Sequence, residues 1–509
     1  MKKILPIIIS RGFIVTLSVF IQVFFWFLIV IIFKDYTTLL SGLMLLISFC
    51  CVLNIIVKDI YPEHKIAWII FMFLFPVAGG MFYLLFGSHR MSSKTKKLSK
   101  TIELNIQNEA KKIKEINQDK LGNVNLVRQH NYLKTIASAP AFENTSVEYF
   151  SVGDNMWTSM LEELEKAEKF IFIESFIIEQ GKMWGAIEKI LINKAKNGVD
   201  VRVLFDDLGC LLTLPSNFIK RLKSNNIDCR VFNKVNQLIN ANFNNRDHRK
   251  ICVIDGNVGF NGGVNLADEY INEKKMFGHW KDTAVMLKGE GVYGLTLMFL
   301  SMWDMQTKAM SNYQKYAPTI KMATDGIVQP FADNPLDNES VGESVYMNML
   351  NTAEKYVYIT SPYLIITREM TTALANAAKS GIDVRLILPG IPDKKIIQFL
   401  SRSYYAPLVE AGVKVYEYTP GFIHSKMFIT DDITSVVGTI NLDYRSLNLH
   451  YECGTMLYNC SVIKDIKKDF IETQNKCKQI YREDISKNSK MGAIKFFVLA
   501  VLKVFSPLM

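Results

Sequence analysis

The sequence predicts an α/β protein in which two similar domains in tandem form one pseudo-twofold site, preceded by an all-α transmembrane anchor. A long internal repeat predicts the tandem, because each copy alternates strand-like apolar runs with helix-like segments. Three long uncharged stretches at the start of the 509-residue chain predict the anchor. The net charge of +10 suits a negatively charged partner, either nucleic acid or an anionic membrane surface.

The first ninety residues (1–90) are expected to form the anchor, with two to three spans at about 13–33, 37–57 and 66–86. The third contains Pro76 and two glycines, so it can also form a bent or re-entrant segment. Buried core helices are the alternative interpretation of all three. The larger cluster of lysines and arginines follows the third stretch, which favours a cytoplasmic location for the domains that come after it.

Two further segments flank the predicted domains. Residues 91–141 are rich in charged side chains, and the helical spacing of Ile102–Ile116 predicts a connecting helix whose lysines can also face lipid head groups. Residues 488–509 combine lysines with bulky apolar side chains, which predicts an amphipathic tail lying in the membrane interface. A helix packed back onto the catalytic domains is the alternative for this tail.

The internal repeat defines the two domains, at about 142–310 and 326–484. Each copy reads strand, helix, strand, helix, strand, and then the strand that the motif histidine is expected to begin, which is an α/β layer arrangement. The clearest matched segments are Ala167–Ser175 with Ala353–Ser361, and Gly198–Leu204 with Gly381–Ile387.

A short motif recurs in both copies with unchanged spacing. A histidine and a lysine two positions apart share one face if they begin the strand, so an imidazole and an ammonium converge. The aspartate lies an odd number of positions further on and points the other way, which favours a scaffold role. The matched residues are His248, Lys250, Asp255, Gly262 and Asn265, repeated as His424, Lys426, Asp431, Gly438 and Asn441.

This doubled HxK(x4)D pattern resembles the phospholipase D superfamily, and the apolar start and tail are similar to bacterial cardiolipin synthases. The resemblance implies two phospholipase D-like domains. It also implies a catalytic set of His248, Lys250, Asp255, His424, Lys426 and Asp431. One departure is that Gly263 follows the first motif glycine where many members have a hydroxyl, whereas the second copy keeps Thr439.

The residue types suit phosphodiester chemistry. A neutral imidazole can attack phosphorus while a protonated imidazole donates to the leaving alkoxide. The two lysines, helped by Asn265 and Asn441, would neutralise the phosphoryl oxygens. No ligand cluster such as HExxH occurs, so neither a metal nor another cofactor is expected. The residues leave open which histidine is the nucleophile, and we favour His248 because superfamily members with unequal halves commonly use the first copy.

Each histidine needs a partner that fixes its tautomer. We expect Asp282 to orient His248 and Glu452 to orient His424, because both carboxylates follow their motif at a similar distance in strand-like runs. Solvent-exposed carboxylates on edge strands are the alternative.

The resemblance implies a transferase that joins two phosphatidylglycerol molecules into cardiolipin and releases glycerol. Phosphatidylglycerol and anionic membrane lipids are then the partners, and nucleic acid is not. Three alternatives use parts of the same sequence: a hydrolytic membrane phospholipase D that makes phosphatidic acid, a nuclease of the same superfamily, and a non-catalytic lipid-binding protein. The predicted anchor argues against the nuclease, and two complete motifs argue against the binder. The oligomeric state is unknown from the sequence.

Overall fold

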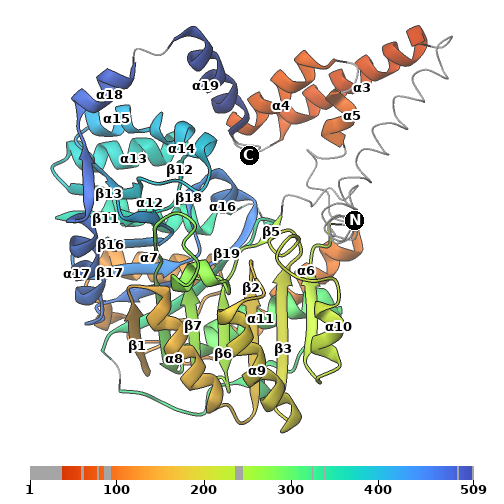
Figure 1. The fold of residues 1–509 in the computed structure, drawn as a ribbon, viewed down its shortest axis with the longest axis vertical. Coiled ribbons are helices and arrows are strands. Elements are labelled where there is room, and N and C mark those ends of the chain that lie inside the picture. The colour runs from red at the N-terminus through yellow and green to blue at the C-terminus, as the bar shows by residue number, and fades with distance from the viewer. Residues whose placement is uncertain are drawn as a thin grey trace.

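The computed structural model describes residues 37–58, 62–76, 79–84, 93–235, 245–323, 325–337, 339–489 and 492–506. The first expected span, 13–33, lies outside these residues. Two α/β lobes, each built on one sheet, make up most of the molecule, and a group of helices extends from them (Figure 1).

The first lobe contains a seven-stranded sheet. Its parallel part is formed by three strands joined through helices, and four antiparallel strands extend the sheet on one side. In sheet order the strands are β1 (Thr145–Phe150), β9 (Ala284–Gly289), β7 (Val258–Gly262), β6 (Ile251–Ile254), β2 (Phe170–Ser175), β3 (Asp200–Asp206) and β4 (Asp228–Phe232). The helices of this lobe are α8 (Gly153–Glu165), α9 (Lys182–Lys196), α10 (Phe218–Lys223) and α11 (Val292–Thr307).

The second lobe repeats this strand order and adds one strand at the parallel edge. In sheet order it has β10 (Ile327–Asp333), β19 (His450–Tyr458), β17 (Thr434–Gly438), β16 (Met427–Thr430), β11 (Tyr356–Thr360), β13 (Asp383–Pro389), β14 (Lys414–Tyr418) and β20 (Cys477–Ile480). Its helices are α12 (Val341–Thr352), α13 (Arg368–Lys379), α14 (Lys395–Arg402), α15 (Tyr405–Glu410), α16 (Tyr444–Asn448) and α17 (Ile463–Gln474). The order of elements predicted from the repeat is confirmed in both lobes.

A continuous apolar core joins the two lobes. It takes side chains from both sheets, such as Phe172 of β2 and Ile429 of β16, and from helix α11, which is buried along most of its length. Burial of this apolar surface holds the lobes in one arrangement and therefore fixes the relative position of their motifs.

The charged segment after the N-terminal helices does more than connect them to the lobes. Its side chains pack against the core shared by the two lobes and within the core of the second lobe. A connecting helix is present as α6 (Ser93–Ala110), but it begins and ends earlier than the expected Ile102–Ile116. It packs against α11, and α7 (Val124–Ile136) packs against α12. Leu126 and Leu133 of α7 are buried in the core of the second lobe. These contacts give the length of the segment a physical reason.

The N-terminal helices lie beside the C-terminal one. Helices α3 (Thr37–Val57), α4 (Pro62–Leu74) and α5 (Gly79–Phe82) pack together, and α19 (Ala493–Phe505), which follows α18 (Arg482–Ser489), contacts α4 and α14 (Figure 1). Within the described part of the chain, none of the helices combines the length and apolar character that a membrane crossing requires.

Candidate active site

Two short strand pairs that cross between the lobes position the motif histidines. Strand β5 (Arg246–Asp247) ends just before His248 and pairs with the start of β19, while β15 (Gly421–Ile423) ends just before His424 and pairs with β8 (His279–Lys281). The backbone N–H of each histidine extends the hydrogen bonding of its strand pair by one residue. His248 donates to the carbonyl of Tyr451 at 3.0 Å, and His424 donates to that of Lys281 at 2.7 Å. Both histidines lie before their expected strands, not within them.

This crossing brings a carboxylate of one lobe to the histidine of the other. His248 Nδ1 lies 2.8 and 2.9 Å from the carboxylate oxygens of Glu452, and His424 Nδ1 lies 2.6 Å from Asp282 Oδ2. The expected pairing of Asp282 with His248 and of Glu452 with His424 is therefore wrong. Each carboxylate follows directly after the strand residues that pair across the lobes, so it contacts the opposite histidine. The alternative of solvent-exposed carboxylates is also excluded, because both are fully buried.

Burial sets the protonation of the two histidines. It lowers the pKa of His248 to about 3 and that of His424 to about 4, against the raising effect of their carboxylates. The pKa of Glu452 is also held well below its usual range, because His248 and neighbouring donors outweigh its burial. The free site therefore presents neutral imidazoles whose Nδ1–H groups face carboxylates, which leaves each Nε2 able to accept a proton or attack an electrophile.

The two carboxylates have different surroundings. Glu452 accepts hydrogen bonds from Thr439 Oγ1 and, at 2.6 Å, from Ser446 Oγ. Asp282 accepts from the backbone N–H of Thr283 at 2.9 Å. A Cβ on Gly263 would lie 2.0 Å from Asp282 Oδ1, so the missing hydroxyl of the first motif has a steric cause. The N–H of Gly263 already donates to the carbonyl of Thr283 and is not a spare donor.

The two motif lysines lie next to their histidines. Lys250 Nζ donates to the carbonyl of His248 at 2.5 Å, and Lys426 Nζ contacts both the carbonyl and Nδ1 of His424. Burial lowers the pKa of Lys250 to about 8 and that of Lys426 to about 7. The positive charge of Lys250 also contributes to the lowered pKa values of His424 and Lys426, so the two motifs act on one another electrostatically.

Different rings flank the two histidines. His248 has Phe176 and His450 as neighbours, with ring centroids 5.1 and 5.5 Å away. His424 lies among aromatic rings only, including Tyr270 at 5.4 Å and Trp280 at 5.6 Å. Trp280 and His450 each stand two residues before the orienting carboxylate. Comparing the two copies at that offset is the sequence signal that could have identified His450.

The motif aspartates belong to the scaffold. Asp255 accepts three backbone N–H groups, from residues 168, 169 and 170, at 2.7 to 2.8 Å. Asp431 accepts the equivalent three from residues 354, 355 and 356 at 2.7 to 2.9 Å. The scaffold role expected from their position is confirmed. Their place in the catalytic set implied by the resemblance is corrected, because both carboxylates are used in tying each motif turn to β2 or β11.

The two motif asparagines differ in their bonding. Asn265 accepts the N–H of Ile177 at 3.0 Å and donates to Tyr270 Oη at 2.6 Å, so it holds a ring that contacts His424. Asn441 has a buried side-chain oxygen without a hydrogen-bond partner. Asn265 is thus a positioning residue, and the side chain of Asn441 is the one available to a ligand.

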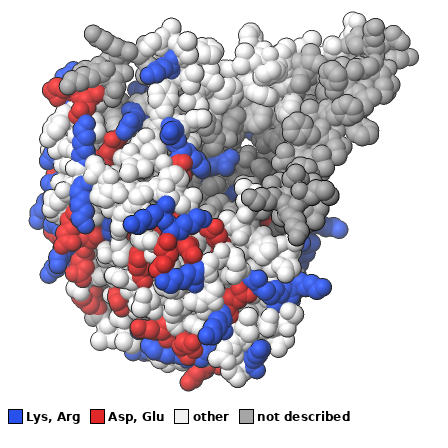
Figure 2. Space-filling model, viewed as in Figure 1, with Lys and Arg blue, Asp and Glu red and all other residues white. Residues whose placement is uncertain are grey.

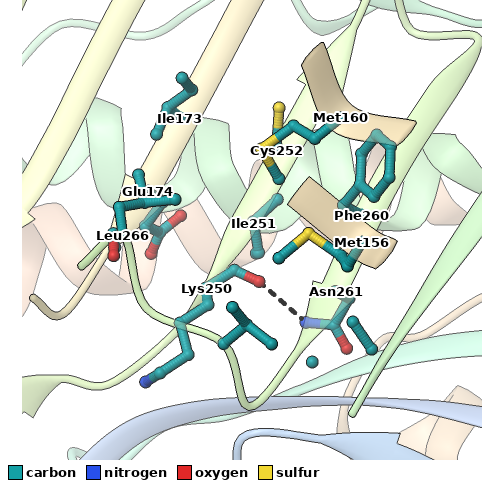
Figure 3. Close-up of a pocket in the computed structure, with 14 residues that line it drawn as sticks. Met156, Met160, Ile173, Glu174, Lys250, Ile251, Cys252, Phe260, Asn261 and Leu266 are labelled. Atoms are coloured by element: carbon teal, nitrogen blue, oxygen red, sulfur yellow. Dashed lines mark hydrogen bonds between the residues drawn. The ribbon is translucent and has the colours of Figure 1, made fainter. Parts of the chain in front are cut away.

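A small cavity lies behind the first motif. Glu174 and Lys250 both line it, as Figure 3 shows, and the carbonyl of Lys250 accepts a hydrogen bond from Asn261 Nδ2 at 3.3 Å. Neither carboxylate oxygen of Glu174 has a hydrogen-bond partner, and burial together with Asp247 raises the pKa of Glu174 well above its usual range. A raised pKa keeps the Glu174 carboxyl protonated and neutral, and burying a neutral carboxyl costs less free energy than burying a carboxylate.

Among the described residues, one group of histidines and carboxylates could hold a metal ion. His248, His450 and Glu452 offer ligand atoms that all lie within 4.8 Å of one another. The grouping itself could not be predicted from the sequence, because His248 comes from the first lobe and the other two residues from the second.

Comparison with known proteins identifies the family of both lobes. The family model described as "Cardiolipin synthase, PLD-like domain" matches residues 160–286 and 346–473, and a "Phospholipase_D-nuclease N-terminal" model matches residues 42–88. A cardiolipin synthase of a Geobacillus strain is 35% identical over 92% of this chain and 94% of its own length. An uncharacterised protein of Streptococcus mutans is 44% identical over 87% of this chain and 96% of its own.

A solved structure has the same fold. The phosphatidylserine synthase of Haemophilus influenzae superposes with a TM-score of 0.57 at 15% sequence identity, covering 76% of this chain and all of that one. The match extends over both lobes, in agreement with the tandem α/β architecture. On the family model and the Geobacillus relative together, the chain belongs to the cardiolipin synthase family of the phospholipase D superfamily.

Proposed function

We propose that this protein is a phosphatidyltransferase that makes cardiolipin and glycerol from two phosphatidylglycerol molecules. The observation that carries the proposal is the pair of buried histidines, each beside a lysine and each bonded through Nδ1 to a carboxylate from the other lobe. Membership of the cardiolipin synthase family supports the lipid substrate.

In the first step, Nε2 of His248 attacks the phosphorus of one phosphatidylglycerol. The N–P bond forms as the bond from phosphorus to the glycerol oxygen breaks, and His424 in its protonated form gives that oxygen a proton. Glu452 holds the Nδ1–H of His248 and stabilises the positive charge that develops on the ring. Lys250 and Lys426 neutralise the phosphoryl oxygens.

In the second step, the now neutral His424 removes the proton from the terminal hydroxyl of a second phosphatidylglycerol. The resulting alkoxide attacks phosphorus and displaces His248, which restores both imidazoles. The free site has a neutral His424, so His424 must take up a proton from solvent when the substrate binds. The negative phosphate supports this, because a nearby anion raises the pKa of His424 and the two lysines.

We further propose that the protein is held at the bacterial membrane by its N-terminal apolar segments and by α19. Exposed apolar side chains on α19, including Ile494, Phe496 and Phe497, support contact of this helix with lipid. On the face seen in Figure 2, acidic and basic side chains are interspersed over the two lobes, whereas the tail adds lysines among apolar residues. The lysines and arginines after the third apolar segment favour catalytic domains on the cytoplasmic side.

A product assay tests the function. Full-length protein in vesicles of phosphatidylglycerol as sole lipid should yield cardiolipin and free glycerol in equal amounts. His248→Ala and His424→Ala should both lose activity by at least about 10⁴-fold. Phosphatidic acid as the sole product would instead establish a hydrolase, in which water replaces the second lipid hydroxyl.

A further inference from the structure

A third histidine stands at the first motif with no role in the proposed reaction. His450 lies beside His248, with ring centroids 5.5 Å apart, and its Nδ1 is 3.6 Å from Glu452 Oε1. Both of its ring nitrogens are inaccessible to solvent and without a hydrogen-bond partner. The side chain as a whole is 11% exposed, but ring nitrogens that are shielded from water and lack partners cost free energy unless another ligand satisfies them at some stage.

The donor set around this histidine has the composition and spacing of a zinc site. Two imidazoles and one carboxylate, from His248, His450 and Glu452, are ligands that Zn²⁺ prefers. Tetrahedral Zn²⁺ with bonds of about 2.0 Å places its ligand atoms about 3.3 Å apart. The separations from Glu452 Oε1 are 2.8 Å to His248 Nδ1 and 3.6 Å to His450 Nδ1, and all three ligand atoms lie within 4.8 Å of one another, so the side chains must draw together by up to about 1.5 Å to hold the ion. Thr439 and Ser446 already hold the carboxylate from outside.

From this geometry we propose that His248, His450 and Glu452 form an inhibitory binding site for Zn²⁺. Two of the three donors are imidazoles, so Mg²⁺, which prefers oxygen ligands, should not bind. The second motif lacks such a site, because Trp280 stands beside His424 in the position equivalent to His450.

Inhibition follows from the tautomer of His248. In the free site Nδ1 carries the proton and bonds to Glu452, while Nε2 has the lone pair. Zn²⁺ bound at Nδ1 takes the lone pair of that nitrogen, so the proton of the neutral ring moves to Nε2. An imidazole protonated at Nε2 cannot attack phosphorus. This inhibition rests on the proposed function of His248 as nucleophile, whereas metal binding itself does not.

Cobalt and zinc titrations of the full-length protein in lipid-free detergent micelles test the binding. Co²⁺ should produce the visible absorption band of a tetrahedral nitrogen and oxygen site, and Zn²⁺ should abolish it by competition. His450→Gln and His450→Trp should weaken binding at least about tenfold. His279→Gln is the matched control, because His279 lies outside the cluster and bonds Tyr418; its titration should equal that of the wild type.

Turnover measured on phosphatidylglycerol vesicles supplies the second readout. Zn²⁺ should abolish wild-type activity, a chelator should restore it, and His450→Gln should need at least about tenfold more Zn²⁺ for the same loss. Absence of the cobalt band in the wild type, or unchanged binding in a folded His450→Gln variant, would overturn the site. Binding without loss of turnover would overturn the inhibition alone. A protein that binds Zn²⁺ but makes only phosphatidic acid would retain the site and reject the transferase.

Discussion

The two histidine sites share the same backbone pairing between the lobes and differ in the side chains that surround each histidine. His248 and His424 each follow a short strand that pairs with the other lobe, and each meets a carboxylate from that lobe. Around His248 lie a second imidazole and a carboxylate held by two hydroxyls. Around His424 lie aromatic rings and a carboxylate packed against a glycine.

This difference shows how one duplicated domain can supply two chemical roles. Symmetric pairing gives each imidazole a carboxylate from the other lobe, whereas the unequal neighbours set how each ring holds its proton. In the reaction proposed above, Glu452, with two hydroxyl donors and a carboxyl pKa well below its usual range, would stabilise the positive charge on a phosphorylated His248 ring. That environment suits the nucleophile, and the aromatic environment of His424 suits a group that gains and loses a proton.

The strongest test of this division is a trapped intermediate. We expect His424→Gln to accumulate a phosphatidyl adduct on His248 when the substrate carries p-nitrophenol, a leaving group that needs no proton. Formation of the adduct then requires only the nucleophile, but its breakdown lacks a general base and should slow by about 10² to 10⁴-fold. Peptide mass spectrometry locates the adduct and the nitrophenol burst counts it.

His248→Gln is the matched variant for that experiment. It should give neither burst nor adduct with the same substrate. An adduct on His424 in the His248→Gln protein would reverse the two roles while leaving the two-histidine site intact.

The crossed carboxylates give the next largest effect. Because Glu452 holds His248 and Asp282 holds His424, Glu452→Gln should slow formation of the adduct and Asp282→Asn should slow its breakdown, each by about 10²-fold. Single-turnover measurements with the p-nitrophenyl substrate separate the two rates. Pairing within each lobe would produce the opposite assignment, with Asp282→Asn affecting formation.

The crossing marks the limit of what could be predicted from the sequence. The repeat contained the order of strands and helices and the proximity of each histidine to its lysine, because these depend on local periodicity. Which carboxylate meets which histidine depends on how the lobes pack, through a buried core that draws on both sheets. The same reason hid the contact between His450 and His248, whose residues lie in different lobes.

A smaller effect is expected from the residues that follow the motif glycines. Gly263→Ala places a Cβ against Asp282 Oδ1 and displaces that carboxylate from His424, so breakdown of the adduct should slow by about tenfold. Thr439→Val removes a hydroxyl donor from Glu452 and should slow formation of the adduct by a similar factor. Both rates come from the single-turnover assay. Equal effects of either variant on both steps would mean that the lobes are not specialised.

The smallest difference between the lobes is expected at the motif aspartates, where their contacts are alike. Asp255→Asn and Asp431→Asn each keep a residue that tolerates the positive φ of 54° or 56° but weaken three bonds to backbone N–H groups. Each should lower the thermal midpoint by about 4 °C, from a loss of about 2 kcal/mol, with turnover per folded molecule unchanged. Calorimetry beside the product assay measures both quantities. A loss of turnover without a lower midpoint would return these aspartates to the catalytic set. Equal destabilisation by the two variants would mean that both lobes kept the same contacts at their motif turns after duplication, while the groups around the two histidines diverged.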